Sequence, residues 1–264
     1  MTNEQRLEFE AQGYLVLDTR ADALEGLQTA FDRALQQDLL NDLPNQDDAF
    51  IYLAEHPDFF PTVYYILSDD LQLRSTNGLY LPPHSPGRGW QRQVAGLLGV
   101  HHPTSTLCLQ VFFHLDDCLK DDALLTVVPG SQRFKSELQF PEITHIEDMP
   151  HSVTLPAKAG TAVIVHGNLW QARRGNCSNA PRRLVELTYI HCWMRQALPA
   201  LSPAARDIVR ASHNLSQLFG LTDDIDRASN YWHLRIEGYP ASTGLPERRF
   251  SPLKVVGKGT APNT

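Results

Sequence analysis

The feature that most restricts the fold of this chain is a series of short apolar segments between residues 71 and 196, separated by turns that contain proline and glycine. Each segment has the length of a β-strand, and several alternate apolar with polar residues. The segments are LQLRS, GLYL, TLCLQVFFHL, ALLTVVP, HSVTLP, TAVIVH and LVELTYIHCW. Short strands at this frequency predict a β-sandwich or jelly roll with helices packed outside it.

Helices are expected before and after this β-region, because apolar residues recur there at helical spacing. Gly13 is placed to end the first helix, and Asp22 is placed to cap the second. The predicted helices cover residues 4–12, 22–35, 52–67 and 201–221. Residues 238–264 are rich in proline, glycine, serine and arginine without any period, which predicts an extended or disordered end.

Composition limits the domain count and the class of partner. The 264 residues are 42% apolar, which is enough for one sizeable core, so we expect a single domain over residues 1–264 with its jelly-roll core at about 71–196. The net charge of -7, with dispersed basic residues, argues against nucleic-acid or anionic-membrane partners. The four cysteines show no CxxC pair, and the start lacks an apolar signal region, so a soluble cytoplasmic protein is expected.

Five landmarks occur in a recognisable order: FEAQGYLVL, LYLPPHSPGRGWQRQ, LQVFFHLDD, VVPGSQR and WQARRGNCSNAPRR. Together they resemble the phytanoyl-CoA dioxygenase family of iron(II)- and 2-oxoglutarate-dependent oxygenases over residues 6–221. The resemblance implies a mainly β, cupin-like double-stranded β-helix with flanking α-helices. In such enzymes two histidines and one carboxylate hold iron at the mouth of the jelly roll, with positions left open for 2-oxoglutarate and dioxygen.

The positions that the resemblance assigns to the metal ligands hold glutamines in this chain. The His-x-Asp motif of the family reads Gln91-Arg92-Gln93, directly after Trp90. The distal histidine precedes an asparagine by five residues and the 2-oxoglutarate-binding arginine by eleven. Counting back from both anchors ends at Gln171.

Other cofactor contacts implied by the family are also changed. Leu81 stands where a lysine often precedes Pro-Pro, and Arg173 replaces a serine two residues after the distal ligand. The histidine that closes the PGS turn of the family is Gln132 here, although it is no ligand. Of the 2-oxoglutarate contacts, Arg182 or its neighbour Arg183 remains.

Glutamine at these positions changes the chemistry that a site can support. Gln91 and Gln93 point to one face if the strand is extended, and Gln171 is expected to face them from another strand. Neutral carboxamides are weak oxygen donors for a first-row metal, so we predict that tight iron binding is lost. The same groups donate and accept hydrogen bonds, which suits orienting a carbonyl or hydroxyl and stabilising a developing oxyanion. Glutamines that only satisfy one another in an inactive interior are the competing interpretation.

Further candidates complete the predicted site. Arg173 and Arg182 are candidates for binding a substrate carboxylate. His102, next to His101 in a loop after the glutamines, and Tyr80 are candidates for moving a proton. The competing interpretations are a solvated loop for the two histidines and core packing for Tyr80. The aromatic residues expected in the core or in the wall of the pocket are Trp90, Phe112 and Trp170.

A metal triad shifted along the chain is a further alternative. His114 and Asp116 have the His-x-Asp spelling, and His166 or His191 would have to supply the third ligand. The family places this strand between the metal motif and the PGS turn, which argues against the shifted triad.

The sequence therefore leads to one function hypothesis with two alternatives. The first is a metal-independent, redox-neutral isomerase, cyclase or lyase without a cofactor, acting on a small and partly apolar metabolite of specialised metabolism. The second is a non-catalytic binding protein, or a partner of an active oxygenase in a homo- or hetero-oligomer. The third is an iron(II)- and 2-oxoglutarate-dependent dioxygenase with unusual ligands.

Overall fold

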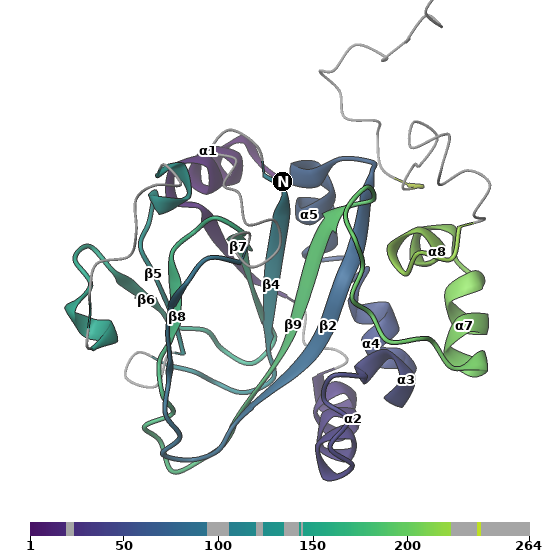
Figure 1. The fold of residues 1–264 in the computed structure, drawn as a ribbon, viewed down its shortest axis with the longest axis horizontal. Helices are drawn as coiled ribbons and strands as arrows, with labels where there is room; N and C mark the ends of the chain where they lie inside the picture. Colours follow the sequence, from purple (N-terminus) through teal and green to yellow (C-terminus); the bar gives the residue numbers. More distant parts are fainter. Residues whose placement is uncertain are drawn as a thin grey trace, which may run out of the picture.

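The computed structural model describes residues 1–19, 24–93, 106–119, 124–134, 143, 145–222 and 237–238. Its strands form two antiparallel sheets (Figure 1). The larger sheet has the order β1-β7-β4-β9-β2, with β1 at Tyr14–Asp18, β2 at Leu71–Leu81, β4 at Cys108–His114, β7 at Thr161–His166 and β9 at Arg182–His191. The smaller sheet has the order β3-β8-β5-β6, with β3 at Arg88–Gln91, β5 at Leu125–Val127, β6 at Val153–Leu155 and β8 at Gln171–Arg173. This arrangement confirms the predicted mainly β fold with flanking helices.

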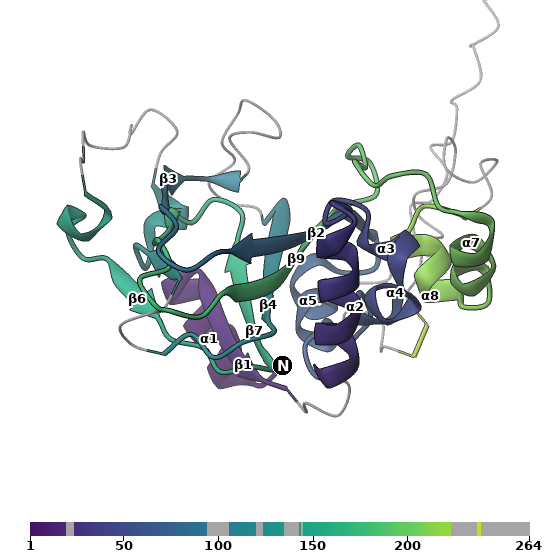
Figure 2. The ribbon, with the colours of Figure 1, turned by 90° about the horizontal axis from the view of Figure 1, so that it is seen from below.

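Most of the helices cover the face of the larger sheet that points away from the smaller one. Figure 2 shows α2 to α5 along that face and α7 and α8 beyond them. The helices are α1 Asn3–Gln12, α2 Leu24–Gln36, α3 Leu43–Gln46, α4 Asp48–Leu53, α5 Phe60–Leu67, α7 Pro203–Arg210 and α8 His213–Leu218. The single helices predicted at 52–67 and 201–221 are each two shorter ones. In the second case Ser212 starts a new helix, because its side chain accepts a hydrogen bond from the Leu215 amide.

Two main apolar cores lie on the two faces of the larger sheet. The helix-side core packs the helices against alternate residues of the strands, such as Val185, Leu187 and Tyr189 of β9. The inter-sheet core packs the other face against the smaller sheet and includes Phe112 and Leu184. Because successive residues of a strand point to opposite faces, position along each strand decides which core a side chain enters.

The start of the chain is fixed by local capping. The side chain of Thr2 accepts from the Gln5 amide, and the Gln5 side chain accepts from the Thr2 amide, which forms a capping box at α1. Gly13 ends the helix with φ at 82°, as predicted. A Cβ atom there would lie 2.5 Å from Oε1 of Gln132, so both conformation and space require glycine.

An ion-pair network joins the larger sheet to α2. Arg183 donates through Nη2 to Oδ1 of Asp116 at 2.7 Å and through Nε to Oδ2 at 3.0 Å, and Nη1 reaches Oδ2 of Asp32 at 2.8 Å. The hydrogen bonds to Asp116, and more weakly that to Asp32, raise the pKa of Arg183 against the opposing effect of burial. Arg183 is therefore a structural residue on the helix side of the sheet.

The loop between β8 and β9 is held by Asn176, which is 1% exposed. Its Nδ2 atom lies within hydrogen-bond distance of three carbonyl oxygens, those of Leu81, Pro82 and Ala180, at 2.8 to 3.1 Å. Its Oδ1 atom accepts from the amide and hydroxyl of Ser178. The asparagine anchor of the family motif thus holds the end of β2 next to the start of β9.

We expect Asn176→Ala to lower the free energy of unfolding by about 2–4 kcal/mol, since buried carbonyl and amide groups lose their partner. Chemical denaturation of the purified variant measures this change. Asn179→Ala is the matched control in the same loop, because Asn179 is exposed and its side chain contacts His84 at the surface. Equal destabilisation by the two substitutions would contradict the structural role of Asn176.

His114 at the end of β4 is fully buried, and neither ring nitrogen has a hydrogen-bond partner in the described part of the chain. Burial lowers the pKa of His114 to about 4 from 6.5, although the charge of Asp116 opposes the shift. The unfolded chain therefore binds a proton between pH 6.5 and 4 that the folded chain excludes. Stability supplied by the neutral ring is present above this window and is lost as the pH falls through it.

We predict that wild-type protein loses about 3 kcal/mol of unfolding free energy through His114 between pH 6.5 and 4. His114→Leu should flatten this part of the pH profile, whereas His145→Gln at an exposed position should leave it unchanged. Urea denaturation at several pH values provides the measurement. A profile of His114→Leu parallel to that of the wild type would show that the buried ring does not titrate as described.

Candidate functional site

The pairing of β3 with β8 brings together two of the three predicted glutamines. Gln91 lies directly opposite Gln171, and Arg88 lies opposite Arg173. Three residues of β3 span the distance covered by two residues of β8, so one extra residue forms a β-bulge. Because of the bulge, Arg88 and Gln91 share the face to which Gln171 and Arg173 point. Gln93 lies two residues after Gln91, just beyond the end of β3.

Two glycines allow the loop before β3 to approach the chain after β8. A Cβ atom on Gly87 would lie 2.5 Å from the Arg173 carbonyl oxygen, and one on Gly175 would lie 2.5 Å from the Ser85 carbonyl oxygen. The Asn176 amide also donates to the Ser85 carbonyl at 3.0 Å. Backbone contact on both sides therefore fixes β3 relative to β8 and sets the positions of Gln91 and Gln171.

Gln171 belongs to a chain of hydrogen bonds that crosses between the two sheets. Its Nε2 atom donates to Oε1 of Gln110 on β4, and Nε2 of Gln110 donates to Oε1 of Glu186 on β9 at 2.6 Å. Gln171 and Gln110 are each 1% exposed, whereas Glu186 is half-buried. We call these three residues the Glu186–Gln110–Gln171 chain.

A charged arginine lies beside this chain. Burial lowers the pKa of Arg173, Glu186 opposes that effect, and the like charge of Arg88 adds to it. A guanidinium stays protonated despite such a shift. Arg173 and Glu186 therefore place opposite charges close together at the edge of the inter-sheet core.

Gln91 and Gln93 differ from Gln171 in their surroundings. Both are half-buried, and neither side chain makes a hydrogen bond to a residue that the structure describes. Their carboxamides are thus open to a ligand, while the amide nitrogen of Gln171 is already engaged.

Two more predicted residues point into the inter-sheet core or toward its edge. Phe112 lies opposite Glu186 on the adjacent strand and packs in this core, and its role in the wall of a pocket stays a prediction. Arg182 lies opposite Leu81 at the start of β9, and Leu81 packs against the same core. Arg182 is therefore the arginine of the pair that faces inward, and Arg183 faces the helices.

Tyr80 does not belong to this site. It lies opposite Arg183, and it packs against the helix-side core. The prediction that its phenol faces the glutamines is wrong, because Tyr80 is one residue out of phase with Leu79 and Leu81, which pack against the inter-sheet core.

Trp90 and Trp170 also lie away from the glutamines. They pack with Val128 and Met149 in a separate small cluster, and the Trp170 ring contacts Phe134 edge-on at 5.2 Å between ring centroids. Each tryptophan directly precedes a glutamine of the site, so strand alternation sends its ring to the opposite face. Of the two predicted places, core or pocket wall, the structure shows the first, since Trp170 is buried in a small core on the outer face of the smaller sheet and Trp90 packs against it.

The remaining histidine candidates do not form a site in the described structure. His102 and its neighbour His101 lie outside the described residues. His114 is buried in the sheet and Asp116 binds Arg183, so the two side chains of the shifted motif point to different faces. His166 packs near Phe9 and His191 contacts Asp70 at 3.1 Å. No shifted triad is assembled by these described histidines.

The sequence prediction did not include Gln110 and Glu186. Both are polar residues within otherwise apolar strands, LQVFF and LVELT. Such an interruption is a usable signal, because a polar side chain on the buried face of a strand requires a partner. Only the strand pairing shows that these two partners meet next to Gln171.

The donor set determines whether iron fits this site. The three ligand positions offer neutral carboxamides, and one of them is held by Gln110. Within the ranges that the structure describes, no group of three or more histidine, cysteine, aspartate or glutamate side chains could hold a metal ion. These residues do not fit iron(II), which requires imidazole nitrogen and carboxylate ligands in a facial triad.

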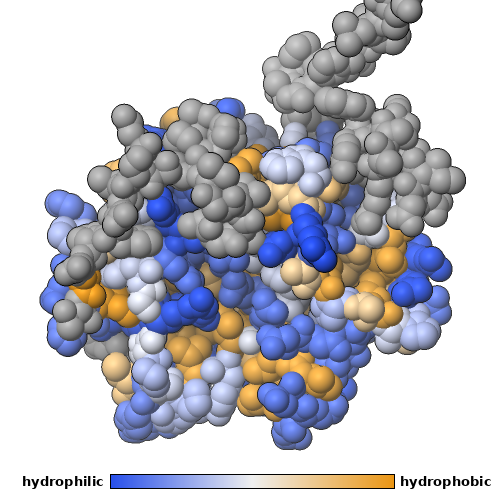
Figure 3. Space-filling model, in the orientation of Figure 1, coloured by the Kyte–Doolittle hydropathy of each residue, from blue (hydrophilic) through white to orange (hydrophobic). Residues whose placement is uncertain are grey.

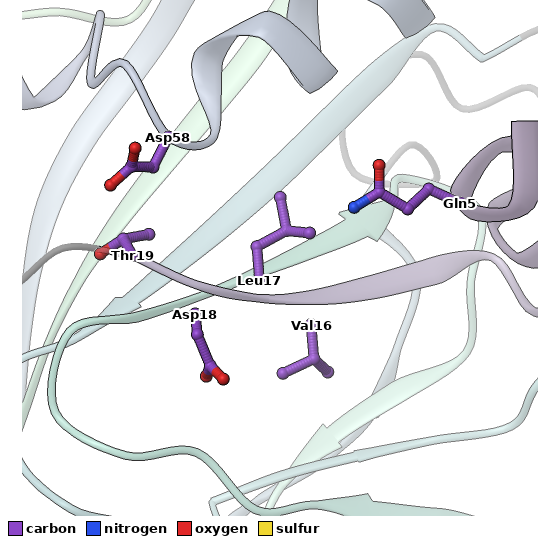
Figure 4. A pocket seen from close by; sticks show the side chains of 6 residues that line it. All are labelled: Gln5, Val16, Leu17, Asp18, Thr19 and Asp58. Carbon is purple, nitrogen blue, oxygen red and sulfur yellow. The ribbon is translucent and has the colours of Figure 1, made fainter. Parts of the chain in front are cut away.

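The surface has other features that lie apart from the glutamines. A hollow of about 470 Å³ lies beside β1, where Gln5, Leu17 and Asp58 line it together with Val16, Asp18 and Thr19 (Figure 4). Figure 3 shows hydrophobic residues in several separate patches among hydrophilic ones on the face seen in Figure 1.

Among the described helices, none has the length and apolar character needed to cross a membrane.

The fold is similar to that of several solved structures, and a family model matches more than half of the chain. HygX from Streptomyces hygroscopicus, solved with iron bound, is 18% identical, with a TM-score of 0.62 over 78% of this chain and 94% of its own. The α-ketoglutarate-dependent carbocyclase SnoK from nogalamycin biosynthesis is 16% identical, with a TM-score of 0.59 over 73% and 85%. The epimerase SnoN from the same biosynthesis is 18% identical, with a TM-score of 0.58 over 75% and 91%. A family model for phytanoyl-CoA dioxygenase matches residues 9–184, and the chain belongs to this family.

Proposed function

We propose that this protein is an enzyme that uses the oxygenase scaffold for a metal-independent, redox-neutral reaction. The reaction is an isomerisation, cyclisation or elimination of a small, partly apolar metabolite in specialised metabolism. The observation that carries the proposal is the charged and polar cluster around Gln171. Glu186, Gln110 and Arg173 surround this ligand position with fixed hydrogen bonds and opposite charges.

The roles in this reaction follow from the contacts of each side chain. Gln91 and Gln93, whose carboxamides are open, orient the substrate and donate to an oxygen on which negative charge develops. Arg173, or Arg182 at the start of β9, binds an anionic group of the substrate. Tyr80 faces the helices and cannot reach the glutamines, so His102 is the proposed acid or base.

The reaction classes of related structures are compatible with this proposal. SnoK is described as a carbocyclase and SnoN as an epimerase, so this fold accommodates cyclisation and epimerisation. Both are described as dependent on α-ketoglutarate, which distinguishes them from the mechanism proposed for this chain.

A second candidate function is that of a non-catalytic binding protein, alone or as partner of an active relative in a homo- or hetero-oligomer. The burial of Gln171 and its bond to Gln110 favour it, because a satisfied carboxamide can serve stability alone. Mass photometry of the protein mixed with an active relative tests for a stable complex. A complex without any small molecule that stabilises the isolated protein would support this second function.

We predict that the wild type binds iron(II) weakly, with no stoichiometric site, in anaerobic calorimetry with and without 2-oxoglutarate. The triple variant Gln91→His/Gln93→Asp/Gln171→His restores two imidazoles and one carboxylate; β3 and β8 pair positions 91 and 171, and position 93 follows just beyond β3. It should bind one equivalent of iron at least about tenfold more tightly, since strong ligands replace weak ones.

Gln37→His on an exposed position of the chain controls for the added imidazole and should leave iron binding unchanged. Metal analysis of untagged protein, purified without chelator, accompanies the titration. Tight stoichiometric iron in the wild type, with consumption of 2-oxoglutarate, would establish the dioxygenase alternative and overturn the metal-independent proposal.

A further inference from the structure

We infer that Glu186 sets the direction of the hydrogen bonds in the Glu186–Gln110–Gln171 chain, so that Gln171 offers its carbonyl oxygen to the ligand. The ligand group bound at Gln171 is then a hydrogen-bond donor, namely a hydroxyl or a protonated amine. The inference rests on the proposed function, in which a small metabolite occupies the site, and it specifies the chemistry of that metabolite.

The direction follows from what each group can do. An ionised carboxylate only accepts hydrogen bonds, so Gln110 must turn its Nε2 atom toward Glu186, at 2.6 Å. The carbonyl oxygen of Gln110 is then left for Gln171, which must donate through its own Nε2 atom. The polarity of both carboxamides is therefore determined by one charge at the end of the chain.

Reversing the direction of the hydrogen bonds in the Glu186–Gln110–Gln171 chain would cost free energy. A flipped Gln110 would direct its carbonyl oxygen at the carboxylate, and a flipped Gln171 would direct its carbonyl oxygen at that of Gln110. Both glutamines are 1% exposed, so water has little access to relieve these contacts. Arg173 places its positive charge near Glu186 at this end of the hydrogen-bond chain.

The end of the hydrogen-bond chain at Gln171 has no partner among the described residues. The carbonyl oxygen of Gln171 accepts no hydrogen bond from any residue that the structure describes. The hydroxyl of Thr188, which lies opposite Gln110 on β9, is buried without a partner among the described residues. A buried polar atom without a partner requires water or a ligand. A ligand hydroxyl can donate to a carbonyl oxygen such as that of Gln171, and it can accept from a hydroxyl such as that of Thr188.

The chain therefore acts as a specificity device with Glu186 as its positioning residue. A substrate with a hydroxyl or ammonium group next to an apolar skeleton fits, because Phe112 supplies an apolar wall opposite Glu186. A plain ketone meets the carbonyl oxygen of Gln171 with its own oxygen and loses this hydrogen bond.

The matched probes are cyclohexanol and cyclohexanone, which share a skeleton and differ in the ability to donate. Each is titrated into ¹⁵N-labelled protein, and the side-chain amide signals of Gln171 and Gln110 are followed by NMR. In the wild type we expect cyclohexanol to bind about fivefold more tightly than cyclohexanone. In Glu186→Gln, where the terminal group can donate as well as accept, the ratio should fall to within about twofold. Glu147→Gln at the surface is the control and should keep the wild-type ratio.

Three results would overturn the inference. One is equal or tighter binding of the ketone in the wild type, and another is the absence of any effect of either probe on the Gln171 amide. The third is unchanged Gln110 amide signals in Glu186→Gln, which would show that the carboxylate does not set the direction. Thermal unfolding of each variant confirms that it is folded. Failure of the proposed function is recognised separately, by tight iron binding in calorimetry. That experiment does not involve cyclohexanol or cyclohexanone.

Discussion

The constraint on which the site depends is the need to satisfy polar groups buried between two sheets. Glu186 and Gln110 lie on adjacent strands of the larger sheet, and Gln171 reaches them from the smaller one. In a relative with a facial triad, a metal ion organises the corresponding ligand positions. In this chain a carboxylate and two carboxamides organise one another by hydrogen bonds, with Arg173 as the nearby positive charge. These hydrogen bonds link the two sheets around a polar interior.

Strand alternation explains why neighbouring residues have separate tasks. Arg182 faces the inter-sheet core, while Arg183 binds Asp116 and Asp32 on the helix side. The same rule separates Trp170 from Gln171 by one position. One residue of slip in β9 would move Arg183 away from Asp116 and Asp32 and turn it toward the inter-sheet core. The bulge in β3 and the glycine contacts around Ser85 prevent slip of β3 against β8 next to the site.

Much of the fold could be predicted from the sequence, because it depends on local patterns. The strand series, the end of α1 at Gly13 and the spacing that leads to Gln171 are each visible in a few residues. The errors concern register and phase. Tyr80 was assigned to the wrong face, because the face of a strand residue is known only when its neighbour in the sheet is known. Gln110 and Glu186 were missed for the same reason, since their meeting depends on the pairing of β4 with β9 across 76 residues of chain.

The glutamines at the three ligand positions differ in whether stability explains them. At Gln171 a carboxamide is required for stability, since an apolar residue would leave the buried carbonyl oxygen of Gln110 without a donor. That requirement does not extend to Gln91 and Gln93, which are half-buried and make no hydrogen bond to any described residue. Stability alone would allow many residue types at these two positions. The carboxamides opposite and beside Gln171 are therefore not explained by stability, and the proposed function gives them a task in orienting a ligand.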